Sequence, residues 1–191
     1  MIVYLIRHGL TRLSEEHRYQ GRLDNGLSET GRAALKSADL FPTRVFVSSA
    51  KRARETAEIL FPQAEQIVCP GFREMDFGLF EGRGWWEMEA DPAYRSWIDG
   101  GCRDRCPEGE DRASYSDRVC SAFEEILPCV DTGEDLVIVA HGGTQMALLE
   151  RYGFPEREYY CWQRPCGCGW RLEFNAKEKK LVVQREIAFL R

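Results

Sequence analysis

The chain has 191 residues, of which 43% are hydrophobic and 30% are charged, so it is long enough to bury a core and falls among globular proteins. Its formal net charge of −5 argues against a nucleic-acid-binding surface, which is normally basic. No apolar run approaches the length of a membrane span, and the first apolar run is too short for a signal peptide. We therefore expect a cytoplasmic protein whose partners include neither a membrane nor a nucleic acid.

The first predicted strand, residues 2–6, is an apolar run that leads into Arg7-His8-Gly9. A polar, turn-rich loop covers residues 11–27. A helix capped by Ser28 or Thr30 follows and continues to Pro42. The next predicted elements are a strand over 44–49, a helix over 50–60, a short strand over 66–69 and a loop over 71–84.

The second half begins with an aromatic and charged segment in helical spacing, followed by a break rich in Gly, Cys and Pro and by a long amphipathic helix. These three segments cover residues 85–97, 100–109 and 111–127. A strongly apolar strand over 136–140, a helix, and strands over 170–174 and 181–184 complete the chain. Strands that alternate with helices predict an α/β fold, a three-layer α/β/α sandwich with a mainly parallel central sheet. We expect one domain over residues 1–191, with about 78–117 as a small helical cap insertion.

Eight cysteines are present, and since no secretory signal is recognised we expect them to be reduced thiols. Cys102 and Cys106, with Cys166 and Cys168, offer a zinc site as an alternative. Paired C-x-x-C spacings and a nearby histidine are missing, however, so we expect no metal.

Two of the three histidines occupy equivalent places in the sequence. His8 and His141 each follow one of the two most apolar strands, and each precedes a glycine. In a parallel sheet, adjacent strand ends would bring both imidazoles into one crevice, at the edge where open α/β sheets bind ligands. The glycines would allow the backbone to approach a ligand closely. The alternative for either residue is a neutral histidine in the core.

A basic cluster opens the predicted helix 50–60, where Lys51, Arg52 and Arg54 lie in the first turn. Cations in that place oppose the helix macrodipole, so the cluster predicts a bound anion. Arg54 suits a solvated helix face, and Arg52 is the better candidate for the pocket.

Four motifs, in this order, resemble the histidine phosphatase superfamily, the phosphoglycerate mutase-like proteins. They are Arg7-His8-Gly9 with Thr11, Ser49-x-x-Arg52-Ala53-x-x-Thr56-Ala57, Arg73-Glu74-Met75-x-Phe77-Gly78-x-x-Glu81-Gly82, and Val139-Ala140-His141-Gly142-Gly143. The family's phosphatase branch is also matched by Gln20-Gly21-x-x-Asp24-x-x-Leu27-Ser28-Glu29-x-Gly31 and Pro107-x-Gly109-Glu110. The resemblance spans nearly the whole chain and implies the phosphoglycerate mutase-like fold.

The resemblance implies that His8 attacks phosphorus and becomes phosphohistidine, while Arg7, Arg52 and His141 hold the phosphate oxygens. Imidazole is nucleophilic when neutral, which an ordinary pKa of about 6.5 largely permits at pH 7. Guanidinium groups suit phosphate because they are always charged and bind its oxygens in bidentate fashion. With these groups around the phosphate, we expect neither a metal nor another cofactor.

The resemblance makes Glu74 the general acid, which protonates the leaving alkoxide and then activates water. Glu81 is the rival acid, and a surface carboxylate in a loop is the alternative for Glu74. Weaker implications are auxiliary phosphate donors at Thr11 and Gln20 and a backbone donor at Gly142. Departures from the family pattern occur at Leu10 (frequently Glu), Ser14 (usually Asn, so this phosphate contact stays open), Gly26 (Pro) and Gln145 (commonly Arg).

The implied function is a metal-independent phosphomonoester hydrolase acting on a small-molecule phosphate. The motif around Glu74 and the aromatic cap are most similar to the α-ribazole phosphatases of cobalamin biosynthesis, which makes α-ribazole 5′-phosphate a candidate substrate. The aromatic residues that either face a ring-bearing substrate or pack the cap onto the core are Trp85, Trp86, Tyr94 and Trp97.

Two other functions stay open. A phosphoglycerate mutase or sugar bisphosphatase would need a second anion site, for which Arg22, Lys51 and Arg54 are available, or a phosphoenzyme protected from water. A non-catalytic phosphate-binding module would need neither a nucleophile nor an acid. The sequence does not fix the oligomeric state, and a homodimer is one alternative.

Overall fold

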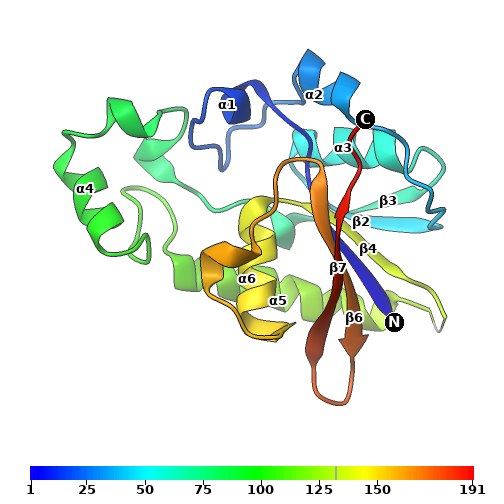
Figure 1. The fold of residues 1–191 in the computed structure, drawn as a ribbon. Helices are drawn as coiled ribbons and strands as arrows, with labels where there is room; N and C mark the ends of the chain where they lie inside the picture. Colours follow the sequence, from blue (N-terminus) through cyan, green and yellow to red (C-terminus); the bar gives the residue numbers. More distant parts are fainter. Residues whose placement is uncertain (132) are drawn as a thin grey trace.

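The computed structural model describes residues 1–131 and 133–191. Its centre is a mixed sheet with the strand order β3-β2-β4-β1-β6-β7-β5 (Figure 1). The strands are β1 (Ile2–Arg7), β2 (Arg44–Ser48), β3 (Glu65–Cys69), β4 (Leu136–Ala140), β5 (Gly153–Phe154), β6 (Cys168–Asn175) and β7 (Lys180–Ala188). Strands β3, β2, β4 and β1 run parallel, β6 is antiparallel to both β1 and β7, and β5 is parallel to β7. The mainly parallel sheet is confirmed.

Helices cover both faces of this sheet, which confirms the predicted three layers. In Figure 1, α2 (Glu29–Ala34) and α3 (Lys51–Leu60) lie on one face, and α5 (Arg112–Ile126) and α6 (Gly142–Tyr152) lie on the other. The remaining helical elements are α1 (Arg12–Glu15), α4 (Pro92–Asp99) and the 3₁₀ turns η1 (Pro70–Phe72), η2 (Gly78–Phe80), η3 (Trp85–Glu87), η4 (Leu127–Cys129) and η5 (Tyr159–Trp162). None of the described helices combines the length and the apolar character that a bilayer crossing requires.

The apolar strands are continuous because they are buried on both faces. Along β1, Leu5 packs into the core shared with α5 and α6, whereas Ile6 packs into the core shared with α3. In β4, Ile138 and Val139 divide between the same two cores. Strands with helices on both sides need apolar residues at every position, and this is what the sequence shows.

The predicted helix over 28–42 is wrong in its length. Ser28 caps α2 by accepting a hydrogen bond from the Gly31 N–H at 2.9 Å, as predicted. The helix ends at Ala34, because Leu35 pairs with Leu190 and the Lys36 N–H donates to the Phe189 carbonyl at 3.0 Å. The segment near residue 190 therefore forms hydrogen bonds with backbone groups that a longer helix would pair internally.

The segment between β3 and α5 extends beyond one edge of the sheet and carries α4 (Figure 1). Helical structure was predicted there over 85–97, but α4 begins only at Pro92. The Asp91 carboxylate caps this helix by accepting from the Ala93 N–H at 3.0 Å. Proline is tolerated in the first turn of a helix and not in its interior, so Pro92 sets the start of α4.

Candidate active site

His8 and His141 lie together at the carboxyl edge of the sheet. Strands β1 and β4 are parallel neighbours with Arg7 beside Ala140 in register, and each histidine follows directly after its strand. The His8 N–H extends this ladder by donating to the Ala140 carbonyl at 2.9 Å. The two ring centroids are 5.2 Å apart, the rings meet edge to face, and both side chains are buried. The two strand ends thus bring both imidazoles together, as expected from the sequence.

The tautomer of His8 follows from its hydrogen bond. Its Nδ1 lies 2.7 Å from the carbonyl oxygen of Gly9. Because a carbonyl can only accept, Nδ1 carries the proton and Nε2 keeps its lone pair. The Gly9 N–H donates to Thr56 Oγ1 at 2.9 Å, which holds the turn that supports the ring.

Both imidazoles are neutral at pH 7. Burial lowers the pKa of His8 well below its ordinary value of about 6.5, and the positive charges of Arg52 and Arg7 lower it further. Burial also lowers the pKa of His141 well below that value, and Arg52 and the His8 ring act in the same direction. A neutral His8 is the form that can act as a nucleophile.

Ser48 is a site residue that the sequence analysis missed. It ends β2, the strand beside β4, and its buried hydroxyl lies 2.7 Å from His141 Nε2. The Ala50 N–H donates to the same hydroxyl at 3.3 Å. The signal that would have found Ser48 is the one that found the histidines, namely a polar residue at the end of a buried strand.

Two arginines surround the imidazoles, and each is held by backbone carbonyls. Arg7 Nη1 donates to the Arg164 carbonyl at 2.9 Å. Arg52, which is 1% exposed in the first turn of α3, donates to the Leu23 carbonyl at 2.9 Å and to the Gly21 carbonyl at 3.0 Å. Its burial lowers the pKa of Arg52, while the nearby Glu74 carboxylate opposes this effect.

Several buried nitrogens of this site have no hydrogen-bond partner among the described residues. They are Arg7 Nε, Gln20 Nε2, Arg52 Nε and His141 Nδ1. Buried polar groups are normally paired, because leaving one unpaired costs about 1–3 kcal/mol. An anion bound beside the two histidines would supply the acceptors that these nitrogens lack within the described structure.

Thr11 and Gln20, the predicted auxiliary donors, are joined to each other. The buried Thr11 hydroxyl donates to Gln20 Oε1 at 2.7 Å and accepts from the Ser14 N–H at 3.1 Å, so Thr11 also caps α1. The Ser14 hydroxyl lies 2.9 Å from the Thr11 hydroxyl and completes this local network. The Thr11 hydroxyl therefore already has its hydrogen-bond partners, whereas the Gln20 amide nitrogen has none among the described residues.

The N-terminus of α6 lies at the same edge of the sheet. His141 is the N-cap residue, and Gly142 and Gly143 open the helix. Backbone N–H groups in a first turn attract anions. A Cβ on Gly142 would lie 2.8 Å from Gln163 Nε2 and 3.4 Å from Arg7 Cζ, so the glycine makes room for Gln163 and places the Arg7 guanidinium next to the helix end. The expected role of Gly142 as a backbone donor to phosphate stays a prediction.

Glu74 is fixed by hydrogen bonds from separate segments. Its Oε1 accepts from the Met75 N–H at 3.0 Å and from the Tyr115 hydroxyl at 2.8 Å. Its Oε2 accepts from the Gly143 N–H at 3.1 Å. A Cβ on Gly143 would overlap the carboxylate, so the second glycine of the pair makes room for Glu74. Tyr115 is fully buried, and no sequence motif had singled it out.

Glu81, the rival acid, has a different environment. Its carboxylate accepts from the N–H groups of Arg22 at 2.7 Å, Leu23 at 2.9 Å and Phe77 at 3.2 Å. These contacts tie the loop before residue 24 to the loop that follows Glu74. The Glu81 carboxylate therefore links two loops, and it does not line the cavity described next.

A cavity of about 210 Å³ lies beside Glu74. Most of its walls are aromatic or otherwise apolar side chains: Tyr19, Met75, Phe77, Trp97, Cys102, Tyr115, Met146, Tyr159 and Tyr160. Of the four aromatic residues predicted either to face a substrate or to pack the cap, Trp97 lines this cavity. Trp85 and Trp86 are 55% and 44% exposed, and Tyr94 packs against Phe80 at 5.4 Å between ring centroids.

Gln145, which stands where the family commonly has arginine, is fully buried and uses its whole amide. Its Nε2 lies 3.3 Å from the carbonyls of Leu5 and Cys168, and its Oε1 accepts from the Arg164 N–H at 2.9 Å. The Arg164 carbonyl in turn accepts from Arg7. Gln145 therefore holds the residue that orients Arg7.

The Pro107-x-Gly109-Glu110 motif holds the segment that contains Glu74. The Glu110 N–H donates to the Asp76 carbonyl at 2.8 Å, and the Glu110 carboxylate accepts from the Asp76 N–H at 3.0 Å. Arg118 of α5 pairs with the same carboxylate at 2.7 Å. The motif thus connects the loop after Glu74 to α5.

The residues considered for a second anion site are exposed, and two of them are paired. Arg22 lies 2.8 Å from the Asp76 carboxylate, and Lys51 lies 3.9 Å from the Glu55 carboxylate. Arg54 is exposed on α3. These cations therefore do not form a converging site like that of Arg7 and Arg52.

The cysteines are free thiols, and burial raises the pKa of Cys106 to about 12. Cys102 lines the cavity beside Glu74, while Cys168 begins β6. Within residues 1–131 and 133–191, no group of three or more His, Cys, Asp or Glu side chains is arranged to hold a metal ion.

Comparison with known proteins gives a consistent result. The model of the histidine phosphatase superfamily (branch 1) matches residues 3–186. "Putative phosphoserine phosphatase 2" of Hydrogenobacter thermophilus is 30% identical over 156 residues, which cover 77% of this chain and 76% of that protein. "Probable phosphoglycerate mutase GpmB" of Erwinia tasmaniensis is 32% identical over 151 residues, covering 73% and 69%. The alpha-ribazole phosphatase from Shigella flexneri has a similar fold, with a TM-score of 0.81 at 24% identity over 99% of this chain and 96% of that chain.

Proposed function

The chain belongs to the histidine phosphatase superfamily, and from that premise we propose that it is a metal-independent phosphomonoester hydrolase that acts on a small-molecule phosphate through a phosphohistidine intermediate. One observation carries the proposal: a buried imidazole with a free Nε2 lies among buried nitrogen donors that have no partner in the described structure. A phosphate would pair with those donors and meet the nucleophile at once. The acidic chain as a whole favours a small-molecule partner over a nucleic acid.

In the first step, the lone pair of His8 Nε2 forms a bond to phosphorus while the bond from phosphorus to the ester oxygen breaks. Arg7, Arg52 and His141 donate to the equatorial oxygens, on which charge accumulates. Each such donor is worth about 10²–10³-fold in rate. These groups supply the positive charge and hydrogen bonds that phosphoryl transfer needs, which is why we propose chemistry without a metal.

Glu74 supplies the proton in the first step and removes one in the second. As an acid, it protonates the leaving alkoxide, so a neutral alcohol departs. As a carboxylate, it takes a proton from water, whose oxygen attacks phosphorus while the bond to His8 Nε2 breaks. Inorganic phosphate is released and His8 regains its lone pair. The support is the position of Glu74, which the Gly143 N–H holds between the helix N-terminus and the cavity.

Ser48 sets the role of His141 in this scheme. When the Ser48 hydroxyl donates to His141 Nε2, the proton of the neutral imidazole is on Nδ1. Nδ1 is the buried ring atom without a partner in the described part of the chain, so this tautomer directs an N–H toward the phosphate. Ser48 is thus proposed as a positioning residue.

The candidate substrate is α-ribazole 5′-phosphate, because the segment around Glu74 resembles that of α-ribazole phosphatases and the cavity walls are rich in aromatic side chains. A phosphoglycerate mutase or sugar bisphosphatase is the second candidate, since several relatives are named as probable phosphoglycerate mutases. The pairing of Arg22 and Lys51 with carboxylates weakens that second candidate. A non-catalytic phosphate-binding module would not use the ordered Glu74.

The test is phosphate release from p-nitrophenyl phosphate and α-ribazole 5′-phosphate in EDTA. We expect turnover by the wild type, loss of turnover in His8→Asn, and an acid-labile phosphoryl group on His8. The matched control is His17→Asn, because His17 is exposed and Asn tolerates its φ of 51°. If the chain isomerised added phosphoglycerate without releasing free phosphate, it would instead be a mutase. If it bound phosphate but turned over no ester, it would be a binding module.

A further inference from the structure

The two glycines at the start of α6 connect the anion site to the cavity beside Glu74. Gly142 lies against the Arg7 guanidinium, whereas Gly143 donates to Glu74 and lines the cavity. An ester whose phosphoryl group meets His8 and Arg7 therefore has its bridging oxygen at Glu74. The rest of the alcohol then extends into the cavity.

The walls of this cavity suit a flat ring. Aromatic side chains enter from separate parts of the chain: Tyr19 after α1, Phe77 after Glu74, Trp97 on α4, Tyr115 on α5, and Tyr159 and Tyr160 on η5. Tyr19 lies 5.2 Å from Phe77 and 5.9 Å from Trp97 between ring centroids, in tilted and edge-to-face arrangements. Such surfaces bind another ring by stacked or edge contacts, and the thioether of Met146 adapts to its shape.

The size of the cavity limits the occupant to one ring system. Its volume is about 210 Å³. A dry apolar cavity of about 150 Å³ is large enough for benzene, whereas pockets that hold a whole drug-sized ligand have about 300–1,000 Å³. The cavity therefore fits a single ring or a fused pair, such as the benzimidazole of α-ribazole, while the ribose and the phosphoryl group of that substrate would stay outside it.

The charges around the cavity disfavour a second anionic group. Arg112 is the one cation among the described lining residues, and its guanidinium carbon lies 4.5 Å from the centre of the Tyr159 ring. Arg112 also lies 3.8 Å from the Glu150 carboxylate, so its charge is already partly compensated. Glu74 also lies on the wall and is uncharged or negative but never positive, so the described lining residues offer a second phosphate or a carboxylate no cation other than Arg112.

We propose that this cavity is a recognition site for the alcohol part of the substrate and that it selects a flat, uncharged ring over an anionic or ring-free alcohol. The inference rests on the proposed function for the placement of the phosphoryl group. It goes further in stating that the ring alone, without a sugar, is sufficient for recognition.

The test measures the binding of three phosphonates by calorimetry: benzylphosphonate, ethylphosphonate and 2-carboxyethylphosphonate. All three present the same kind of anion and cannot be hydrolysed, so the readout does not depend on turnover. We expect benzylphosphonate to bind about 10- to 100-fold more tightly than ethylphosphonate, as burial of a phenyl ring predicts. We expect 2-carboxyethylphosphonate to bind more weakly than ethylphosphonate.

A pair of variants assigns this preference to the cavity. Tyr160 lines the cavity and is 53% exposed, so Tyr160→Ala should fold while losing about 5- to 10-fold of the advantage of benzylphosphonate. Its affinity for ethylphosphonate should not change. The control is Trp86→Ala, which removes an aromatic side chain of similar exposure outside the cavity and should change neither affinity.

Equal affinities for benzylphosphonate and ethylphosphonate would overturn the proposal. The proposal would also be overturned if 2-carboxyethylphosphonate bound most tightly of the three and Arg112→Gln abolished this binding. Arg112 would then recognise an acidic substrate. Turnover of benzyl phosphate separates this result from the proposed function. Ring-selective binding without phosphate release would contradict the proposed hydrolase activity but not the recognition site. Phosphate release without ring selectivity would contradict the recognition site but not the hydrolase activity.

Discussion

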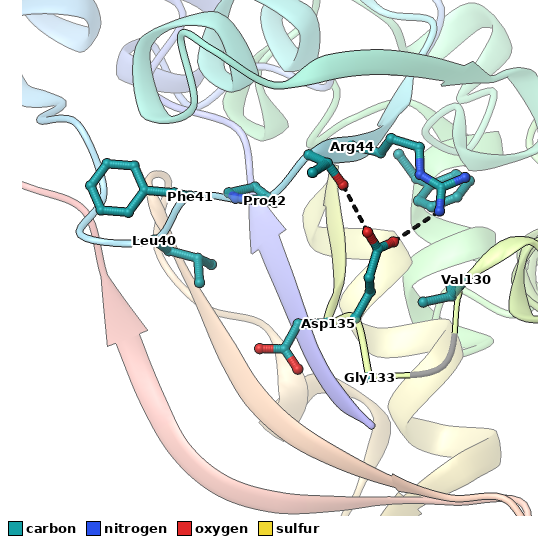
Figure 2. A pocket seen from close by; sticks show the side chains of 10 residues that line it. Leu40, Phe41, Pro42, Arg44, Val130, Gly133 and Asp135 are labelled. Carbon is teal, nitrogen blue, oxygen red and sulfur yellow. Dashed lines mark hydrogen bonds and ion pairs between the residues drawn. The ribbon is translucent and has the colours of Figure 1, made fainter.

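Two hollows of equal volume, about 210 Å³ each, lie at opposite edges of the sheet. Figure 2 shows the hollow at the amino ends of β2 and β4, where Arg44 pairs with Glu134 at 2.9 Å and the Thr43 hydroxyl donates to Glu134 at 3.1 Å. The other hollow lies at the carboxyl edge, beside Glu74 and the two histidines. Volume does not distinguish them.

The treatment of polar groups does distinguish the two edges. At the amino edge, Arg44 is paired with both Asp131 and Glu134. At the carboxyl edge, Arg7 and Arg52 each keep a buried Nε that no described residue satisfies. Stability alone would favour pairing such groups, and proteins leave them unpaired where a ligand completes them. Single unsatisfied donors occur elsewhere among the described residues, at Trp162 Nε1 and Arg164 Nε, so the mark of function here is a group of such donors on the residues around the two histidines rather than the presence of a hollow.

The strongest test of this comparison replaces one arginine by methionine at each edge of the sheet. Arg7→Met should lower kcat/KM for phosphate esters by about 10²–10³-fold, because it removes a donor to the transition state. Its free energy of unfolding should fall by no more than about 1 kcal/mol, since the half-buried guanidinium loses one hydrogen bond, to the Arg164 carbonyl. Arg44→Met should leave kcat/KM unchanged and lower the free energy of unfolding by up to about 1 kcal/mol. Kinetics and urea unfolding measure both effects, and a large kinetic loss in Arg44→Met would break the distinction.

Glutamates at the two edges provide the second test. Glu74→Gln should slow hydrolysis of alkyl phosphates by at least about 10²-fold and affect p-nitrophenyl phosphate far less, because nitrophenolate leaves without a proton. Glu134→Gln, at the amino edge, should change neither rate. Rates on a series of leaving groups give the measurement. Equal losses for both classes of ester would assign the acid to another residue, and Glu81→Gln would then be the variant to examine.

A smaller effect is expected where the support of a site donor is removed. Gln145→Met keeps the side-chain size but leaves the Arg164 N–H and the Leu5 carbonyl without their partner, which should cost about 1–3 kcal/mol of stability. Because Arg164 orients Arg7, the inhibition constant for inorganic phosphate should rise by about 5- to 10-fold. The control Leu172→Ala, in the core of β6, should lower stability without changing phosphate affinity.

The smallest expected effect concerns pH. Burial lowers the pKa of His8 and His141 in the folded chain, so below about pH 6.5 the unfolded chain binds protons that the folded chain does not. The free energy of unfolding should therefore be fully present above that pH and decrease as the pH falls below it. Denaturation at pH 7.5 and 5.5 measures this decrease. This loss of stability between pH 7.5 and 5.5 should be smaller in His8→Asn and unchanged in His17→Asn.

The arrangement of the layers and the meeting of the two histidines followed from the sequence, because both depend on local patterns. Continuous apolar runs mark strands buried on both faces, and adjacent parallel strands must bring their ends together. The motif residues Arg7, Arg52 and Glu74 also lie at this edge of the sheet. Their catalytic roles stay predictions until the variants are measured.

Other features could not be predicted, because they depend on contacts between segments far apart in the sequence. The end of α2 depends on backbone pairing with residues 189–191, and the two-residue strand β5 has no pattern of its own. Tyr115 reaches Glu74 across 41 positions, and Gln145 reaches Leu5 across 140. The predicted set of cap aromatics also differed from those that line the cavity, since helical spacing does not say which face of α4 turns inward.

The glycine at position 143 has a consequence for how this chain could diverge. Alanine there would add one methyl group where the Glu74 carboxylate lies, and it would leave His8, Arg7 and Arg52 untouched. The proposed nucleophile and anion site would survive, while the proposed acid would be displaced. In the scheme proposed above, this single substitution would slow both the loading of His8 from alkyl esters and the release of its phosphoryl group to water, and it would leave phosphate binding intact.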